Sequence, residues 1–216
     1  MPALLLLFTV ASGTPEAVFE RMRARQAELA SLEAVLEQTK SYPQLGIEDP
    51  AERGRLYVER RRAGARVRIE IETPEPRILT VNDRRYVLYQ PRIRQAMEGT
   101  LGSAGKTGLF ASVLTGAPGA LEELERSYSL EGLGTISIAS RPAHHLRFTA
   151  RPGADVHCRR IDVFADEELS LPVRQTCEEA NGSVITFSLT DLKTDVPLDG
   201  KLFEIEIPEG VERVKG

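Results

Sequence analysis

Residues 65–72 read ARVRIEIE, and this stretch decides the fold class. Every second side chain is apolar and every intervening one is charged, so one face of the segment is dry and the other is wet. A period of two is typical of a strand in an antiparallel sheet with one face open to water. Residues 54–59 alternate in the same way, with Leu56 and Val58 as apolar positions, and residues 60–64 form a turn. Together these segments predict a β-hairpin.

The same alternation predicts strands along most of the chain. They are expected at 77–81, 86–89, 135–139, 144–150, 156–164, 172–178, 183–190 and 201–207. Thr14-Pro15-Glu16 supplies an N-cap, a first-turn proline and an early acid, and apolar spacing near 3.6 predicts a helix over residues 14–41. Two short helices are expected at 108–114 and 118–126, within or next to a stretch rich in Gly, Ala, Ser and Thr.

These elements predict a mainly β fold of the α+β class, built on a single strongly curved antiparallel sheet of about ten strands. Such a sheet forms an unclosed β-barrel with a large concave apolar face. The N-terminal helix and a mid-chain helical lid are available to cover that face. If side chains do not fill the interior, a cavity for an apolar ligand remains.

Composition limits the function classes. The 216 residues suit one domain, and the net charge of −4 argues against a nucleic-acid-binding protein. Residues 1–13 are apolar and end in small residues, so they are interpreted as a signal peptide for export, with 14–216 as a single domain. A buried N-terminal segment, or a start codon placed too far downstream, is the alternative. No cysteine follows this run, so no lipid anchor is expected there.

The chain has two cysteines, Cys158 and Cys177, in strands expected on either side of a hairpin near residues 167 and 168. A cross-strand disulfide is sterically reasonable at this spacing, and an exported protein would meet an oxidising compartment. Two unpaired buried thiols are the alternative. Two cysteines and three histidines offer few ligands for a zinc site, so no metal is expected.

No catalytic signature is present in the sequence. It has no Gly-x-Ser-x-Gly elbow, no phosphate-binding glycine loop and no His-Glu-x-x-His. His144 and His145 are adjacent on an expected strand, so they point to opposite faces, and we interpret them as surface residues. Because no acid, base and nucleophile can be assembled, neither an enzyme nor a cofactor is expected.

Two groups of residues are candidates for a binding function. In the turn Arg60-Arg61-Arg62, Arg60 or Arg61 is expected to hydrogen-bond a carbonyl of the lid or the ligand at the cavity rim, because a planar guanidinium holds several acceptors. An exposed turn whose arginines only solubilise the sheet corner is the alternative. The apolar residues of the helix at 108–114 are either ordinary core or a lid that lines the cavity; they are Leu109, Phe110, Val113 and Leu114.

Four segments resemble the outer-membrane lipoprotein carrier family, the LolA-like proteins of the LolA/LolB-type lipoprotein-sorting fold. Residues 54–60 (GRLYVER) resemble its opening Gly-x-Leu-x-x-x-Arg strand, and residues 68–74 (RIEIETP) its Arg-aromatic-Glu-Tyr-x-x-Pro strand. Residues 82–91 (NDRRYVLYQP) are similar to its Asp-Gly-Lys-x-x-Trp-x-Tyr-x-Pro element, with Val87 in place of Trp. Residues 203–211 (FEIEIPEGV) resemble its closing Phe-x-Phe-x-x-Pro-x-Gly-Val.

The resemblance implies an unclosed barrel with a helical lid, which holds the acyl chains of lipoproteins or another lipid. It implies a periplasmic carrier, expected to be a monomer, that moves its cargo from an inner-membrane exporter to an outer-membrane acceptor. A periplasmic envelope sensor or interaction module on the same fold is the alternative. With the lid residues above, the expected cavity lining is Leu56, Val58, Val67, Ile69, Ile71, Val87, Tyr89, Phe148 and Phe187.

Overall fold

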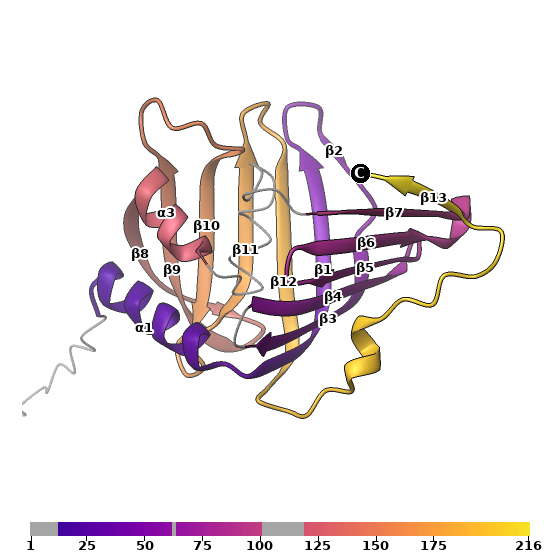
Figure 1. The fold of residues 1–216 in the computed structure, drawn as a ribbon. Helices are drawn as coiled ribbons and strands as arrows, with labels where there is room; N and C mark the ends of the chain where they lie inside the picture. Colours follow the sequence, from indigo (N-terminus) through magenta and orange to yellow (C-terminus); the bar gives the residue numbers. More distant parts are fainter. Residues whose placement is uncertain (1–12, 62–63, 101–118) are drawn as a thin grey trace, which may run out of the picture.

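The computed structural model describes residues 13–61, 64–100 and 119–216, and most of them lie in β-strands (Figure 1). The strands are β1 (Ser31–Tyr42), β2 (Ile47–Glu48), β3 (Glu52–Arg61), β4 (Gly64–Thr73), β5 (Arg77–Asn82), β6 (Arg85–Gln90), β7 (Gln95–Thr100), β8 (Tyr128–Ile138), β9 (Arg141–Ala150), β10 (Cys158–Asp166), β11 (Pro172–Glu179), β12 (Val184–Thr194) and β13 (Glu212–Lys215). The helices are α1 (Pro15–Glu28) and α3 (Ala120–Ser127), with short 3-10 helices η1 (Pro91–Ile93) and η2 (Gly200–Phe203).

All of these strands belong to one 13-stranded sheet. Its order is β13-β7-β6-β5-β4-β3-β1-β12-β11-β10-β9-β8, with β2 beside β1. The pairings are antiparallel except that of β13 with β7, which is parallel. The sheet curls so that β3 to β7 run across the direction of β1 and β12 and pass in front of them (Figure 1). The terminal strands β13 and β8 do not pair within the described residues. The prediction of one strongly curved, unclosed sheet is confirmed, with thirteen strands rather than about ten.

The N-terminal helix is shorter than predicted. Thr14 caps it, with Oγ1 accepting the Ala17 N–H at 3.3 Å, and the helix ends at Glu28. The following residues form β1, which pairs with β3 on one side and β12 on the other. A helix over residues 14–41 is therefore wrong in its second half. Two sets of strand pairings outweigh the helix propensity of the Leu, Glu and Ala residues in this stretch.

The sheet has an inner face, which we define as the face that α1 and α3 pack against, and an opposite outer face. Both helices lie over the β8–β10 end of the sheet (Figure 1). Phe19 and Met22 of α1 and Leu124 of α3 are buried in one core cluster with Phe148 of β9. The Phe19 and Phe148 ring centroids are 5.5 Å apart. The short helix predicted at 118–126 is observed as α3, whereas the one predicted at 108–114 lies outside the described residues.

The chain after β12 covers part of the outer face and does not form the strand predicted at 201–207. Side chains of β4 and β5 hold its backbone instead: Arg68 Nη1 donates to Leu202 O at 2.9 Å, and Asn82 Nδ2 donates to Phe203 O at 3.0 Å. Both strands already have neighbours on each side, so this segment cannot join them. The chain re-enters the sheet only at β13, which pairs with β7. The sequence pattern did not predict β13.

A disulfide joins Cys158 of β10 to Cys177 of β11, with their Cα atoms 5.5 Å apart. The cysteines are not directly opposite each other, because Cys158 pairs with Glu179 and Cys177 pairs with Ile161. A register shift just after Cys158 interrupts the ladder there. The Tyr128 hydroxyl donates to Cys158 O at 2.8 Å, and burial raises the pKa of Tyr128 to about 12. The disulfide end of β10 is thus tied to both β11 and β8.

Candidate functional site

The inner face is apolar across most of the sheet, and strand register shows why. Directly paired residues of antiparallel strands share a face. Leu32 pairs with Val58, Val58 with Val67, and Val67 with Val81, so one apolar row crosses β1, β3, β4 and β5. A second row crosses β9 to β12 and consists of Phe148, Ile161, Cys177 and Ile185.

The two ends of this face differ in their cover. At the helix-covered end, β8 to β11, α1 and α3 seal the core, and Ile161 and Val163 are 0% exposed. At the open end, β5 to β7, neither helix packs against the face within the described residues (Figure 1). The apolar inner-face side chains there are all only half-buried; they are Leu79, Val81, Tyr86, Leu88 and Met97. Between the ends, a buried cluster from β1, β3 and β4 is closed by Leu29 and Leu171.

Most of the predicted cavity residues lie on this inner face. Val67, Ile69 and Ile71 of β4 pack in the middle cluster, next to two residues of β3. Phe148 belongs to the helix-covered end, and Phe187 packs against both clusters. The sequence therefore placed seven of its expected lining residues on one shared surface: Leu56, Val58, Val67, Ile69, Ile71, Phe148 and Phe187.

Val87 and Tyr89 lie on the outer face, so their assignment to the cavity lining is wrong. Val87 pairs with Thr80 and Tyr89 with Ile78, whereas Leu88 pairs with Leu79, opposite Ile69. The neighbours Tyr86 and Leu88 occupy the inner face instead. The two-residue turn after Asn82 is the signal that could have found them, since it sets this register. The predicted lid residues Leu109, Phe110, Val113 and Leu114 lie outside the described residues.

Gly99 of β7 is also part of the open end. It pairs with Tyr86, and a Cβ atom at Gly99 would lie 2.7 Å from the Tyr86 ring. The glycine therefore makes room for the ring across the strand pair. This requirement comes from the strand pairing, so the residue gave no signal in the sequence.

The two described rim arginines face opposite ways. Arg60 follows Leu56 and Val58 on the inner face, is half-buried, and has a guanidinium pKa lowered by burial. Arg61 points outward, and its Nε lies 3.6 Å from a Glu59 carboxylate oxygen. Arg62 lies outside the described residues. Of Arg60 and Arg61, only Arg60 lies on the inner face, at the end of β3 next to the apolar residues.

The histidines do not form a common site. His144 is on the inner face, with Nδ1 3.3 Å from Thr135 Oγ1, and His145 is on the outer face, with Nε2 2.8 Å from Asp162 Oδ1. Their opposite orientation matches the prediction. Their interpretation as surface residues is wrong for His144, which is buried. Within the described residues, no group of three His, Cys, Asp or Glu side chains could hold a metal ion.

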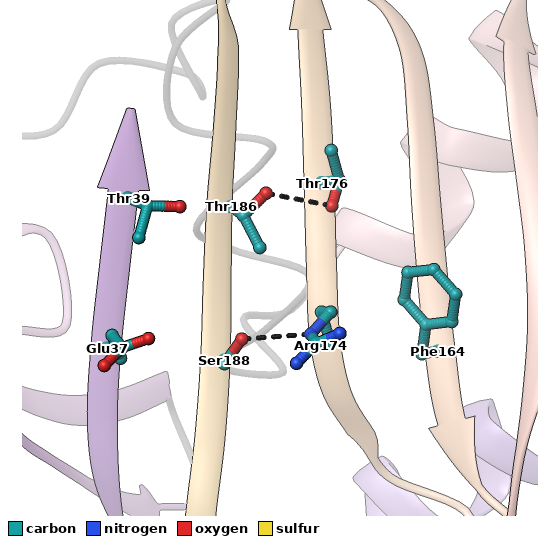
Figure 2. Close-up of a pocket in the computed structure, with 7 residues that line it drawn as sticks. All are labelled: Glu37, Thr39, Phe164, Arg174, Thr176, Thr186 and Ser188. Atoms are coloured by element: carbon teal, nitrogen blue, oxygen red, sulfur yellow. Dashed lines mark hydrogen bonds between the residues drawn. The ribbon is translucent and has the colours of Figure 1, made fainter. Parts of the chain in front are cut away.

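Pockets lined by described residues occur away from the open end. One of about 230 Å³ lies between the start of α1 and β8–β9, beside His144. Another of about 340 Å³ lies on the outer face, over β1, β12, β11 and β10 (Figure 2). No helix among the described residues has the length and apolar character needed to cross a membrane.

No protein-family model and no curated protein matches this chain. Solved structures do share its fold. An uncharacterized conserved protein from Thermus thermophilus superposes with a TM-score of 0.59 at 12% identity, covering 93% of this chain and 98% of that one. A chain of the MucA/MucB complex of Pseudomonas aeruginosa gives 0.54 at 15% identity, covering 89% of this chain and 61% of its own length. The Mycobacterium tuberculosis lipoprotein LppX gives 0.51 at 16% identity, covering 85% and 98%.

At these identities the likeness is one of fold. The expected architecture, an open, curved sheet with helices on its inner face, is confirmed, and the chain shares this fold with LppX and with the Thermus thermophilus protein. A LolA superfamily protein from Nitrosomonas europaea is also among the matching structures, with a TM-score of 0.42. The matches with TM-scores above 0.5 show that the chain has the fold of these structures, and its own strand register gives that fold an apolar inner face.

Proposed function

We propose that the protein is an exported carrier that binds acyl chains of lipoproteins, or of other lipids, against its inner face. The observation that carries the proposal is the open end, where five apolar side chains of β5 to β7 are only half-buried on a continuous apolar face. An acyl chain lying there would bury them further, as α1 and α3 bury the other end. The proposed route runs through the periplasm, from an inner-membrane exporter to an outer-membrane acceptor.

The energetics suit a carrier. Each methylene removed from water contributes roughly 0.8 kcal/mol, so eight methylenes in contact with the face contribute about 6 kcal/mol. That contribution is enough to bind an acyl chain, which is poorly soluble in water. The open end gives the bound acyl chain a route for release. Arg60, half-buried beyond Val58, is the residue we propose for contact with a polar group next to the acyl chain.

The proposed compartment is supported by the disulfide between Cys158 and Cys177. Disulfides persist in oxidising compartments such as the bacterial periplasm and are rare in reducing ones. The apolar residues 1–13 fit an export signal, although most of them lie outside the described residues.

A matched pair of variants tests the binding face. Leu88 and Val87 are neighbours in β6, both are half-buried, and they face inward and outward respectively. In displacement of a fluorescent fatty acid, Leu88→Ser is expected to weaken binding at least about fivefold, because a leucine side chain contributes more than 1 kcal/mol on burial. Val87→Ser is expected to stay within about twofold of the wild type by the same reasoning.

Native mass spectrometry of protein purified from a bacterial envelope provides the second readout. Co-purified lipid or lipoprotein in the wild type, depleted in Leu88→Ser, supports the proposal. Equal probe binding by the two variants, or a wild type that binds no acyl probe at all, would overturn it.

A sensor or interaction module is the second candidate, favoured by the superposition on MucB, which is solved both alone and in complex with MucA. The same native mass spectra distinguish the two. A stoichiometric protein partner with no lipid on the inner face supports the module, and bound lipid without such a partner supports the carrier.

A further inference from the structure

The outer-face pocket is a hollow of short hydroxyl side chains between longer ones. Figure 2 shows two parallel rows across four strands: Glu37, Ser188, Arg174 and Phe164 in one, and Thr39, Thr186 and Thr176 in the other. Neighbouring strands lie about 4.8 Å apart, so the first row spans about 14 Å. The pocket has a volume of about 340 Å³, at the small end of the range for small-molecule sites.

Arg174 differs from the arginines around it. Arg147 donates to Asp162 Oδ1 at 2.8 Å, and Arg53 donates to Glu37 Oε2 at 2.8 Å. Within the described part of the chain, Arg174 has no carboxylate partner, and its one hydrogen bond is from Nε to Ser188 Oγ at 3.1 Å. Its two terminal amino groups therefore remain available as donors, in a protein whose net charge is −4.

The hydroxyl groups add donors beside it. Ser188 Oγ already accepts from Arg174, so its own hydrogen is left to donate. Thr176 and Thr186 share one hydrogen bond of 3.1 Å between their hydroxyls, which uses only one of the two hydrogens. Glu37, the acid at the end of the row, is offset by Arg53. Arg174 and the hydroxyls therefore bring uncommitted donors to the pocket, and Glu37 is the one carboxylate among the described residues that line it, which makes an anion the fitting ligand at the Arg174 end.

Phe164 forms the apolar wall of the pocket. Its ring stacks on His145 with centroids 4.3 Å apart, and His145 is held in turn by Asp162. The contact with His145 therefore restrains the Phe164 ring on the side away from the pocket. It would pack against the carbon part of a ligand whose charged end lies at Arg174.

We propose that this pocket binds a small oxyanion group, a phosphate or a carboxylate, at Arg174, Ser188 and the Thr176–Thr186 pair. The group is held by the guanidinium fork and by hydroxyl donors, the combination that suits tetrahedral and planar oxyanions. The site is on the opposite side of the sheet from the proposed acyl-binding face, so it does not depend on that function.

Titration of the full chain with inorganic phosphate, and separately with acetate, followed by calorimetry at fixed ionic strength, tests the site. Arg174→Gln is expected to weaken the bound anion at least about tenfold, since it removes a charge-assisted pair of donors. Thr186→Val, which keeps the side-chain shape, is expected to weaken it about threefold. Arg213→Gln is the charge-matched control, because Arg213 lies on β13 and pairs with Glu98.

Vesicles distinguish the source of the anion. Sedimentation with phosphatidylglycerol, compared with phosphatidylcholine, reports on a lipid phosphate, and loss of that binding in Arg174→Gln would assign the pocket to a headgroup. Binding of free phosphate or acetate without vesicle binding would assign it to a soluble ligand. The proposal is overturned if neither free anion nor vesicles bind, or if Arg174→Gln and Arg213→Gln behave alike. Fatty-acid probe binding by Arg174→Gln should be unchanged whichever source is correct.

Discussion

Over β8 to β11 the inner face is sealed by α1 and α3, whereas over β5 to β7 the same face meets neither helix among the described residues. Ile161 and Val163 are fully buried, while Leu79 and Leu88 are only half-buried. Both ends nevertheless carry apolar residues at alternate positions in the sequence. Within the described residues, burial under helices fixes one end of the face, while the other keeps half-buried apolar side chains, which are the surface we propose for the ligand.

The largest expected effect comes from breaking the helix-covered end. Phe148→Ala removes a side chain that is 1% exposed and packs on Phe19, and it is expected to cost about 3–5 kcal/mol of unfolding free energy. Leu88→Ala at the open end is expected to cost about 1 kcal/mol, since its burial is partial. Urea unfolding measures both, and equal losses would contradict the division into two ends.

Removing the disulfide tests the same end through the unfolded state. The bridge closes a loop with a sequence separation of 19, so the double variant Cys158→Ala, Cys177→Ala is expected to lose about 3 kcal/mol. Adding reductant to the wild type should lower its unfolding midpoint and leave that of the variant unchanged. A wild type insensitive to reductant after confirmed cleavage of the bridge would show that β10 and β11 are held by packing alone.

Asp166 closes the β10–β11 hairpin beneath the core. Its carboxylate accepts from Arg141 Nε at 2.6 Å and from the backbone N–H of Leu169 at 2.8 Å, and the hydrogen bond from Arg141 holds its pKa below the ordinary value. Asp166→Asn is expected to cost about 2 kcal/mol at pH 7, measured by urea unfolding.

The pH dependence follows from that lowered pKa. Stability from the charged Asp166 is fully present above the unfolded-state pKa of about 3.9 and is lost as pH falls through the lower folded-state pKa. The difference between wild type and Asp166→Asn should therefore be constant from pH 7 to about 5 and shrink below about 4. A gap that instead widened in acid would contradict this assignment.

The smallest expected effect is at the start of the covering helix. Thr14→Ala removes the cap that accepts the Ala17 N–H and should cost about 1 kcal/mol, measured by thermal unfolding. Thr14→Ser should restore most of the loss, because serine caps equally well. If serine fails to rescue, the threonine acts through its methyl contacts rather than as a cap.

The sequence predicted which residues form strands better than it predicted their partners. The run from Ala65 to Glu72 forms β4 as expected, because its alternation is local and both faces agree with it. The stretch around Leu32 and Leu36 fits a helix and a strand alike, since these two residues are four apart and share a face in either structure, whereas Leu29 fits only the helical spacing. Only the pairing of β1 with β3 and β12 resolves that ambiguity.

The candidate site shows the same limit. Val87 and Tyr89 were expected inside, but their strand is apolar on both faces, and a shift of one residue exchanges those faces. The alternation in residues 203–207 also looked like a strand, yet the neighbouring strands had no free edge for it.

Period and charge pattern are carried by neighbours in sequence, so the chain alone determined a curved, half-apolar β fold. Register, edge availability and helix docking join residues far apart in sequence, so only the tertiary structure decided which side chains share the inner face and which end of it α1 and α3 cover.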